Sequence, residues 1–494
     1  MKILALETST SSAKAMLYDT LTDTFDTVTH GYTQDTMTGS GMPGQAASPA
    51  GSGPDAEGCF RQMCAAGREV IQKADRLRRD GKNSADEVEL IALVSVWHSI
   101  LLCDRSHSPV TPVLHWNHTG AAAICSRIRE DASAVRRYYQ TSGCMVNAIY
   151  PFFKIQMLME MGLPVPDSYL LSQGAYNTLR MTGRMAATRC SASGDGLLDI
   201  RKKEYNLNGL HAFGVEEWQL PKLVDSEEMF PLTEEAASLL GLKSGTPVLP
   251  ANADGGSNQI GAGAAREGIM TLSVGTSSAL RLSVKEPLLP AEPSIWCYLS
   301  PKGYLSGAAT NGGCICTDWA KKRLFPAGTG YNEIEGEIRD RETTPVFLPF
   351  LTGERCPGWN DRRAGGFLYV KDHHTAGDLY LAVQEGVLFN LYQCYEELLR
   401  NHPAPEKIML SGGILGSSFW TQMCADIFGQ DMTVTDVTQG SLLGGIVMGM
   451  GAAGIITDVN AYQPKVLRTI RVRPEQHQAY REQYRRYRQA YRET

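Results

Sequence analysis

The sequence predicts an α/β protein that is built as two lobes of related design, and three features lead to this prediction. A chain of 494 residues is longer than one hydrophobic core normally serves. A strand, a polar turn and a second strand are expected within Lys2 to Asp19, and the same order of elements returns at Ile269 to Val284. The tetrapeptide Thr-Ser-Ser-Ala stands in both turns, at Thr10 to Ala13 and at Thr276 to Ala279. We therefore expect a duplicated architecture, with one copy of the hairpin at the start of each half.

The composition is that of an ordinary soluble globular protein, with 43% hydrophobic and 20% charged residues. A net charge of -6 argues against a chain that binds nucleic acid or a membrane surface over its whole length. No apolar run approaches the length of a membrane span, and Met1 to Leu6 leads directly into Glu7 without a signal-peptide core. We therefore expect a cytoplasmic protein. Its twelve cysteines include no CxxC pair and are expected to be reduced thiols.

Local patterns divide the next part of the first half into a loop, a helix and a strand. His30 to Gly58 is rich in Gly, Pro, Ser and Thr, which predicts a long surface loop. A helix is expected at about Ala56 to Arg79. The apolar run Val88 to Val96 then predicts a strand that leads into Trp97 and His98.

Two further segments precede the second half. Asp131 to Gly162 is expected to be mainly helical, with Tyr150-Pro151 as an interruption, because proline breaks a helix interior. Leu242 to Ala251 contains two prolines in the sequence LKSGTPVLPA. We interpret this second segment as the connector between the lobes.

In the second half, short strands alternate with helices. The clearest helix is Asp378 to Arg400, because Thr375 precedes it at capping-box spacing and its apolar residues follow helical spacing. Ile408 to Leu410 predicts a buried strand. A last helix, Pro474 to Arg492, has its tyrosines on one stripe among arginines. In an acidic chain this stripe favours packing on the body of the protein over a nucleic-acid patch.

Short turns rich in Gly, Ser and Thr are the candidate anion-binding elements. The chain has neither a GxxxxGK[ST] loop nor the HRD and DFG elements of protein kinases. The turns Thr10-Ser11-Ser12 and Gly275-Thr276-Ser277 suit phosphates, because small residues let backbone N–H groups approach an anion closely. Gly412-Gly413 would let a flat nucleotide base lie against the backbone, and Asn311-Gly312-Gly313 offers another close approach.

Asp254 stands on a glycine-rich turn, about twenty residues before the second of these turns. Phosphoryl transfer needs mainly positioning and charge neutralisation, together with a base for the substrate hydroxyl. An ordinary Asp-Gly turn accounts for this residue equally well. The pattern alone leaves both interpretations open.

The order of these motifs resembles the FGGY family of carbohydrate kinases over nearly the whole chain. ETSTSSAK is similar to the family's Asp-x-Gly-Thr-x-Ser-x-Lys hairpin, DGGSNQIGAGA to its catalytic-aspartate loop, and SVGTSSALR to its second phosphate hairpin. LPFLTGERCPGWN and LSGGILGSSFWTQMCADIFG resemble two later motifs, of which the second lies on the adenine side. Trp97-His98-Ser99 and Cys297-Tyr298 are most similar to the gluconokinase and xylulokinase branch.

The resemblance implies a two-lobed, actin-like ATPase fold of the ribonuclease H-like type, with a cleft between the lobes. It makes Asp254 the catalytic base, Glu7 a ligand of Mg²⁺, and ATP the phosphoryl donor. The implied ATP-binding residues are Thr10, Ser11, Ser12, Gly275, Thr276, Gly313, Gly413 and Ser417. The implied sugar-binding residues are Trp97, His98, Trp116, His118 and Asp254.

The same resemblance divides the chain into three parts. Residues 1–248 form the expected N-terminal lobe, with the sugar side and the first phosphate turn. Residues 249–458 form the expected C-terminal lobe, with the catalytic aspartate, the second phosphate turn and the adenine side. Residues 459–494 form a C-terminal helical tail.

Four residues depart from the family pattern, and all lie in the first lobe. Glu7 replaces an Asp and reaches one methylene further, and Ser9 replaces a Gly and adopts positive φ less freely, so the turn is expected to differ in shape. His118 and Gly120 replace the Asp and Arg of a Trp-x-Asp-x-Arg motif, which removes a cationic partner for a sugar acid. Arg189 is a candidate to restore that charge.

The sequence thus predicts an ATP-dependent kinase that phosphorylates a hydroxyl of a small sugar, polyol or sugar acid, either gluconate-like or ketose-like. Its only expected partner is this small carbohydrate, with no nucleic acid or membrane, and a homodimer is the candidate assembly. A sugar or nucleotide sensor that has the same fold but impaired catalysis is the alternative. The four departures favour the sensor, whereas the intact Asp254 and both Thr-Ser-Ser turns favour the kinase.

Overall fold

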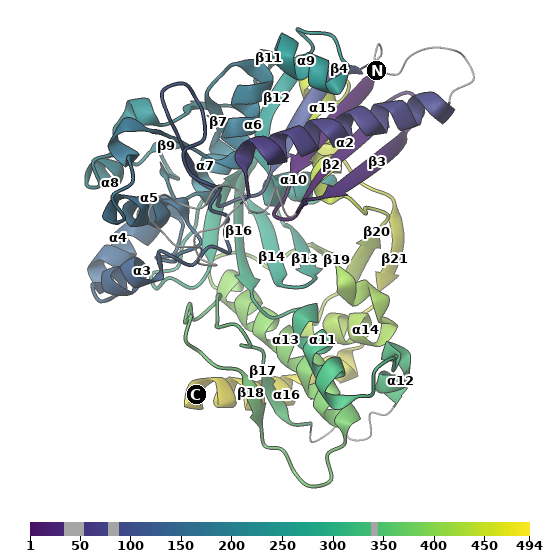
Figure 1. Cartoon of the computed structure of the whole chain (residues 1–494). Coiled ribbons are helices and arrows are strands. Elements are labelled where there is room, and N and C mark those ends of the chain that lie inside the picture. Colours follow the sequence, from purple (N-terminus) through teal and green to yellow (C-terminus); the bar gives the residue numbers. More distant parts are fainter. Residues whose placement is uncertain (34–53, 78–87, 337–343) are drawn as a thin grey trace.

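The computed structural model of the chain describes residues 1–33, 54–77, 88–336 and 344–494. These residues form two lobes, each built around one large mixed sheet with helices packed on it (Figure 1). The predicted α/β class with two lobes is therefore confirmed. The predicted surface loop His30 to Gly58 lies for the most part outside the described residues.

The first sheet has six strands in the order β11-β12-β4-β1-β2-β3. In this order their bounds are Phe230–Pro231, Pro247–Ala253, Val88–Ser95, Lys2–Thr8, Ser12–Asp19 and Thr24–Gly31. The second sheet has seven strands in the order β15-β16-β14-β13-β19-β20-β21. In this order their bounds are Trp296–Ser300, Gly303–Thr310, Ser278–Val284, Ile269–Val274, Lys407–Ser411, Met432–Thr435 and Val466–Ile470.

Both sheets contain the same five-strand unit. In the first, β3, β2 and β1 are antiparallel neighbours, and β4 and β12 continue the sheet parallel to β1. In the second, β16, β14 and β13 are antiparallel neighbours, and β19 and β20 continue it parallel to β13. A helix follows the fifth strand of each unit, namely α10 (Asp254–Gly261) after β12 and α15 (Gly440–Ala452) after β20. The duplication predicted from the two hairpins is thereby confirmed.

The remaining elements cover these sheets or form short additions to them. The other helices are α2 (Ala56–Leu77), α3 (Ala122–Arg129), α4 (Ala132–Ser142), α5 (Pro151–Glu160), α6 (Gln173–Thr182), α7 (Arg189–Gly194), α8 (Leu207–His211), α9 (Glu234–Leu240), α11 (Cys314–Leu324), α12 (Tyr331–Gly336), α13 (Ala376–Leu399), α14 (Ser418–Phe428) and α16 (Pro474–Glu493). Short two-stranded pairs are formed by β5 (Leu101–Cys103) with β6 (Tyr169–Leu171), β7 (Ala186–Thr188) with β10 (Lys222–Val224), β8 (Leu198–Asp199) with β9 (Glu204–Tyr205), and β17 (Val346–Leu348) with β18 (Gly366–Leu368).

Several locally encoded elements agree with the sequence predictions. The capping box before α13 is present, because the Asp378 backbone N–H donates to Thr375 Oγ1 at 3.2 Å and the Thr375 N–H donates to Asp378 Oδ2 at 2.9 Å. The terminal helix α16 buries Tyr484 and Tyr487 against the body. All twelve cysteines are free. None of the helices in the described parts of the chain is long and apolar enough to cross a membrane.

The prediction that Leu242 to Ala251 connects the two lobes is wrong. The second part of this segment forms β12, which pairs in parallel with β4 inside the first sheet. Pro250 fits within this strand because the register with β4 shifts between Leu249 and Asn252, so no ladder hydrogen bond is required of it there.

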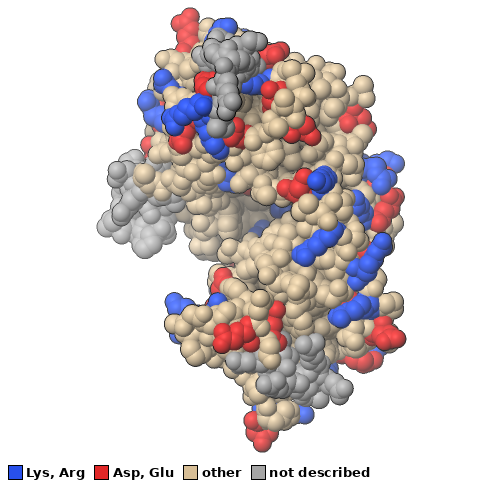
Figure 2. Space-filling view, turned by 90° about the vertical axis from the view of Figure 1, so that its right-hand side faces the viewer, with Lys and Arg blue, Asp and Glu red and all other residues tan. Residues whose placement is uncertain are grey.

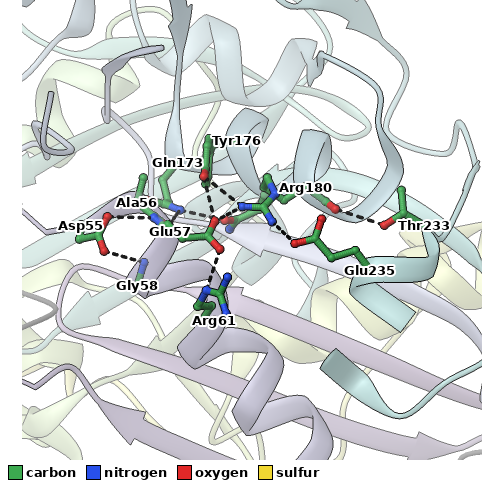
Figure 3. Close-up of polar contacts among 11 residues, drawn as sticks. Asp55, Ala56, Glu57, Gly58, Arg61, Gln173, Tyr176, Arg180, Thr233 and Glu235 are labelled. Carbon is green, nitrogen blue, oxygen red and sulfur yellow. Dashed lines mark hydrogen bonds and ion pairs between the residues drawn. The ribbon is translucent and has the colours of Figure 1, made fainter. Parts of the chain in front are cut away.

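A polar network fastens three helices on the outer face of the first lobe (Figure 3). Glu57, in the first turn of α2, forms ion pairs with Arg180 of α6 and with Arg61 one turn along its own helix. It also accepts a hydrogen bond from Tyr176 at 2.9 Å, and Arg180 reaches on to Glu235 of α9 at 2.5 Å. The network ties α2 to α6 and α9, whose apolar faces share one core with β1 and β4.

The two equivalent helices α10 and α15 cross at glycines. A Cβ at Gly261 would lie 2.0 Å from the Gly440 carbonyl oxygen, and a Cβ at Gly444 would lie 1.8 Å from the Ser257 carbonyl oxygen. Real Cβ atoms do not approach backbone this closely, so glycine is required at both positions. Beyond the crossing, α15 packs its apolar residues on β1, β2 and β4 of the first sheet.

We expect Gly444→Ala to destabilise the protein by on the order of 1–3 kcal/mol, because the added methyl forces α10 and α15 apart. The measurement is the midpoint of chemical denaturation. Gly31→Ala is the matched control, since a Cβ at Gly31 would meet no atom within 4 Å. Equal midpoints for the two variants would show that the crossing tolerates a larger separation.

Candidate active site

A pocket of about 230 Å³ lies where the two lobes meet, and the molecular surface is hollowed between the lobes (Figure 2). The first half contributes the turn after β1 and the loops after β4 and β5. The second half contributes the start of α10, the turn between β13 and β14, strands β14, β15 and β16, and the loop after β17. The residues that line the pocket are Thr10, Val96, Trp97, His98, Trp116, Asp254, Ser277, Ser278, Ala279, Arg281, Trp296, Tyr298, Ala309 and Arg355. Five residues predicted from the sequence thus share one pocket with Ser277 of the second turn. They are Thr10, Trp97, His98, Trp116 and Asp254.

Asp254 is the first residue of α10 and, among the described residues, the one carboxylate that lines the pocket. Its Oδ1 accepts a hydrogen bond from the Gly255 N–H at 2.7 Å. Burial and the nearby Glu7 carboxylate raise the pKa of Asp254 to about 6, against the opposing effects of the Gly255 N–H and Arg281. The carboxylate is therefore ionised at neutral pH but is a stronger base than an exposed aspartate.

His98 has a strained backbone and a fixed ring. Its φ of 62° lies in the left-handed region, which is uncommon for a residue other than glycine and concentrates at functional sites. Its backbone N–H donates to Asp195 Oδ1 at 3.0 Å, and its Nδ1 bonds the Gly194 carbonyl oxygen. Burial, with the positive charge of Arg355, lowers the pKa of His98 to about 3. The imidazole is therefore neutral, its proton is on Nδ1, and Nε2 is left as an acceptor.

Trp97 is held between two glycines. A Cβ at Gly255 would lie 2.4 Å from the Trp97 ring, and a Cβ at Gly194 would lie 2.4 Å from Trp97 Nε1. The indole N–H donates to the Cys190 carbonyl oxygen at 3.1 Å. Trp97 also meets the ring of Tyr298 edge to face at 5.2 Å, and Tyr298 stacks on Trp296 at 4.3 Å. These rings form a rigid aromatic wall for the pocket.

Trp116 and His118 were both predicted to bind the sugar, but only Trp116 lines the pocket. Trp116 donates its indole N–H to Thr10 Oγ1 at 3.0 Å, so the loop after β5 is tied to the turn between β1 and β2. His118 is not among the residues that line the pocket. Its Nδ1 lies 3.4 Å from the Gly120 N–H within its own loop.

The first turn is closed by serine side chains. Ser9 Oγ donates to the Ser12 carbonyl oxygen at 2.9 Å, and the Ser9 backbone N–H donates to the same oxygen at 2.9 Å. Ser9 is not among the residues with positive φ. The turn therefore does not need the glycine that the family pattern has at this position, and it leaves Thr10 and Ser11 at its tip, where Ser11 is exposed.

The second turn packs against the start of α11. The backbone N–H groups of Cys314 and Ile315 donate to the carbonyl oxygens of Gly275 and Thr276, at 2.6 and 3.2 Å. A Cβ at Gly313 would lie 2.4 Å from the Gly275 carbonyl oxygen, so this close contact requires glycine. Gly275, Thr276 and Gly313, predicted from separate motifs, are thus brought together, with Thr276 exposed.

Gly413 lies beside the start of α11, and Ser417 stands at the start of α14. A Cβ at Gly413 would lie 2.8 Å from Cys314 Sγ, which places Gly413 beside the start of α11. Ser417 caps α14, because its Oγ accepts from the Trp420 N–H at 2.9 Å. The same hydroxyl donates to Glu335 Oε1 of α12 at 2.6 Å.

Glu7 is buried at the end of β1. Its Oε1 is 3.3 Å from Lys14 Nζ, and its Oε2 accepts a hydrogen bond from Ser441 of α15 at 2.6 Å. Within the described residues no three His, Cys, Asp or Glu side chains gather as a metal site. Mg²⁺ that arrives with a nucleotide needs only one or two protein carboxylates, because phosphate and water oxygens complete its shell. The carboxylates of Glu7 and Asp254 fit that requirement, since the Glu7 charge reaches Asp254 and raises its pKa.

Sequence reasoning did not single out the two arginines of the pocket. Arg281 and Arg355 both lie within motifs that were matched, SVGTSSALR and LTGERCPGWN, but the motifs did not indicate where the side chains point. Arg189, the predicted source of positive charge, instead forms an ion pair with Asp225 at 2.7 Å and donates to the Lys203 carbonyl oxygen. It is not among the residues that line the pocket.

Lys154 of α5 supports the segments around His98, and its role was not predicted from the sequence either. It is fully buried, and its Nζ lies within hydrogen-bond distance of the carbonyl oxygens of His98, His115 and Ile149, at 3.3, 2.6 and 2.9 Å. Burial lowers the pKa of Lys154 to about 7 and raises that of Asp195 to about 8. Lys154 holds the segments on both sides of His98 in place.

Comparison with known proteins gives a consistent result. Models of the FGGY family of carbohydrate kinases match residues 3–261 with their N-terminal domain and residues 270–453 with their C-terminal domain. A gluconokinase of Bacillus subtilis (strain 168) is 24% identical over 422 residues, which is 82% of each chain. A xylulose kinase of Escherichia coli (strain K12) is 27% identical over 361 residues, or 71% of this chain and 73% of its own.

The same fold is found among solved structures. A gluconate kinase from Lactobacillus acidophilus superposes with a TM-score of 0.89 at 24% identity, over 99% of this chain and 98% of its own. A glycerol kinase from Plasmodium falciparum, solved with ADP, superposes with a TM-score of 0.85 at 14% identity, over 100% of this chain and 98% of its own. The actin-like, two-lobed fold that the sequence implied is therefore confirmed.

We expect Lys154→Met to destabilise the protein by on the order of 3 kcal/mol, because three buried carbonyl oxygens lose their donor. The denaturation midpoint measures this loss. Lys202→Met is the control, since Lys202 is exposed and pairs only with Asp199 at 3.9 Å. An unchanged midpoint for the Lys154 variant would mean that these carbonyls are satisfied without the ammonium group.

Proposed function

The chain belongs to the FGGY family of carbohydrate kinases, and we propose that it transfers the γ-phosphoryl group of ATP to a hydroxyl of a small sugar, polyol or sugar acid, with Asp254 as the general base. The observation that supports this most directly is the shared pocket. It brings Asp254 together with the neutral His98, the aromatic wall and residues of both hairpin turns. At about 230 Å³ it is smaller than the usual pocket for a drug-sized ligand and suits a small carbohydrate.

In the reaction, the Asp254 carboxylate accepts the proton of the substrate hydroxyl while the hydroxyl oxygen bonds to the γ-phosphorus. The bond between the γ-phosphorus and the bridging oxygen breaks, and ADP leaves with that oxygen. His98 Nε2 accepts a hydrogen bond from a neighbouring substrate hydroxyl and fixes its orientation. The rings of Trp97, Trp296 and Tyr298 pack against the carbon chain.

The phosphates would be held by the two hairpin turns. Thr10 and Ser11 are at the tip of one turn, and Gly275 and Thr276 lie at the other, with Gly313 directly behind it. Exposed hydroxyls and backbone N–H groups of this kind are suited to anions. Glu7 and Asp254 would hold Mg²⁺ through its waters, and the ion would neutralise phosphate charge during transfer. Gly413, beside the start of α11, and Ser417, at the start of α14, would form the adenine side.

Asp254→Asn should lower kcat by a factor of about 100 or more on the preferred substrate, because the amide cannot accept the proton. ADP release measured across a panel of hexonates, pentuloses and polyols tests this. Asp318→Asn is the control, since Asp318 is exposed on α11 and bonds Tyr331 outside the pocket. Unchanged turnover in the Asp254 variant would overturn its assignment as base. Binding of Mg-ATP by the wild type without ADP release on any sugar would favour the sensor.

The pH dependence follows from the charges around Asp254. Because its pKa is about 6 and only the ionised form accepts a proton, kcat/KM should fall about tenfold per pH unit below pH 6. Glu7 raises this pKa, so Glu7→Gln should move the acid limb to lower pH even where it also reduces the rate. The profile is measured at saturating ATP. An acid limb at the same pH in both proteins would contradict the role of Asp254 as the titrating group.

A further inference from the structure

We propose that Asp195 is a positioning residue of the carbohydrate site, because its carboxylate holds the backbone of His98 in the left-handed conformation that places the imidazole ring in the pocket wall. The inference rests on the proposed function, since it takes His98 as a residue that contacts the substrate. Asp195 is not among the residues that line the pocket, so it acts through His98. It stands directly after α7, at the C-terminal end of that helix.

Buried, ionisable side chains hold both peptide groups of His98. The His98 backbone N–H donates to Asp195 Oδ1 at 3.0 Å, and the His98 carbonyl oxygen accepts from Lys154 Nζ at 3.3 Å. A φ of 62° is unfavourable for a residue with a Cβ, and it persists only where the surroundings impose it. Asp195 imposes it on the N–H side of His98, and Lys154 does so on the carbonyl side.

The same end of α7 also fixes the ring of His98. The Gly194 carbonyl oxygen accepts a hydrogen bond from His98 Nδ1, and Gly194 directly precedes Asp195. Two consecutive residues thus hold the backbone and the ring of His98. If the backbone of His98 turned, the ring would lose the Gly194 contact, and Nε2 would no longer be fixed as the acceptor.

The carboxylate of Asp195 serves this contact above all others. Asp195 is 5% exposed, and a carboxylate buried to this extent is costly unless it is well paired. The fully buried Asp426 accepts from the backbone N–H and the guanidinium of Arg473, at 2.8, 2.9 and 2.6 Å. Among the described residues, the Asp195 carboxylate accepts from one donor, the His98 N–H. Loss of this carboxylate should therefore be felt at the pocket.

Helix α7 also joins this side of the pocket to the second lobe. Ser193 Oγ accepts a hydrogen bond from the backbone N–H of Leu299 on β15 at 2.9 Å. The same strand contributes Tyr298, whose ring meets those of Trp97 and His98 edge to face, with centroids 5.2 and 5.7 Å apart. The end of α7 therefore sets how these residues of the first lobe lie against the aromatic wall of the second.

Two substitutions separate the position of the acceptor from its charge. Asp195→Asn keeps an acceptor oxygen in place without the charge, whereas Asp195→Glu keeps the charge and moves both oxygens by one methylene. We expect Asp195→Glu to raise the KM for the carbohydrate about tenfold or more, with the KM for ATP within about twofold of the wild type. Asp195→Asn should keep most of the wild-type affinity. The measurement is ADP release on the preferred member of the panel of hexonates, pentuloses and polyols.

Asp426→Asn is the matched control, because it changes a buried aspartate outside the pocket. It should lower the denaturation midpoint and leave both KM values unchanged. Asp195→Ala, which removes the acceptor without adding volume, takes the place of the Glu variant if that variant does not fold.

Two results would overturn the proposal. One is an Asn variant whose KM for the carbohydrate rises as much as that of the Glu variant, which would assign the effect to the charge. The other is a Glu or Ala variant that keeps wild-type KM values, with or without a loss of stability, which would assign Asp195 a structural role.

The NMR signals of the histidine ring nitrogens test the inference without any substrate. The protein carries ¹⁵N-labelled histidine, and the His98 signals are identified by their absence from His98→Gln. In the wild type and in Asp195→Asn, His98 should remain a neutral ring with its proton on Nδ1 between about pH 5 and 8. In Asp195→Glu both tautomers should appear. Identical His98 signals in all three proteins would contradict the proposal.

These signals also separate the inference from the proposed function. The expected change in the Glu variant supports the inference even where no carbohydrate is phosphorylated, in which case the kinase assignment alone fails. Phosphorylation of a carbohydrate with the same His98 signals and the same KM values in every variant overturns the inference and leaves the kinase assignment standing.

Discussion

The close crossing of α10 and α15 is the constraint on which the site depends. Each helix follows the fifth strand of its own unit, and their backbones meet at Gly261 and Gly444 with no room for a side chain. Asp254 begins the first of these helices, and Ser441, at the start of the second, bonds the buried Glu7. The crossing therefore fixes the separation of the Glu7 and Asp254 carboxylates.

Each of the two helices also contacts the sheet of the opposite lobe. This explains why neither half completes the site alone. Gln259 of α10 hydrogen-bonds Thr271 and Ser283 of the second sheet, at 2.8 and 3.1 Å. In the opposite direction, α15 packs its apolar residues on the first sheet. The crossing of α10 and α15 therefore joins the two sheets through the helix that begins with Asp254.

The sequence predicted those parts that local patterns specify. The two hairpins, the capped helix α13 and the tyrosine stripe of α16 each depend on residues that are neighbours along the chain. The segment Leu242 to Ala251 was wrongly interpreted as a connector because its prolines suggest a loop, and only the pairing with β4 shows the bulge that accommodates Pro250. The roles of Lys154, Arg281 and Arg355 could not be predicted, since they depend on which distant groups do or do not face them.

Opposing charges set the base strength of Asp254. Glu7 raises its pKa while Arg281 lowers it, and burial adds to the first effect. A single carboxylate beside a guanidinium would be a weak base, and one beside another carboxylate alone would be protonated near neutral pH. With both neighbours present the carboxylate stays ionised yet basic. Arg281 thus helps to keep the Asp254 carboxylate ionised at neutral pH, against the effects of burial and Glu7.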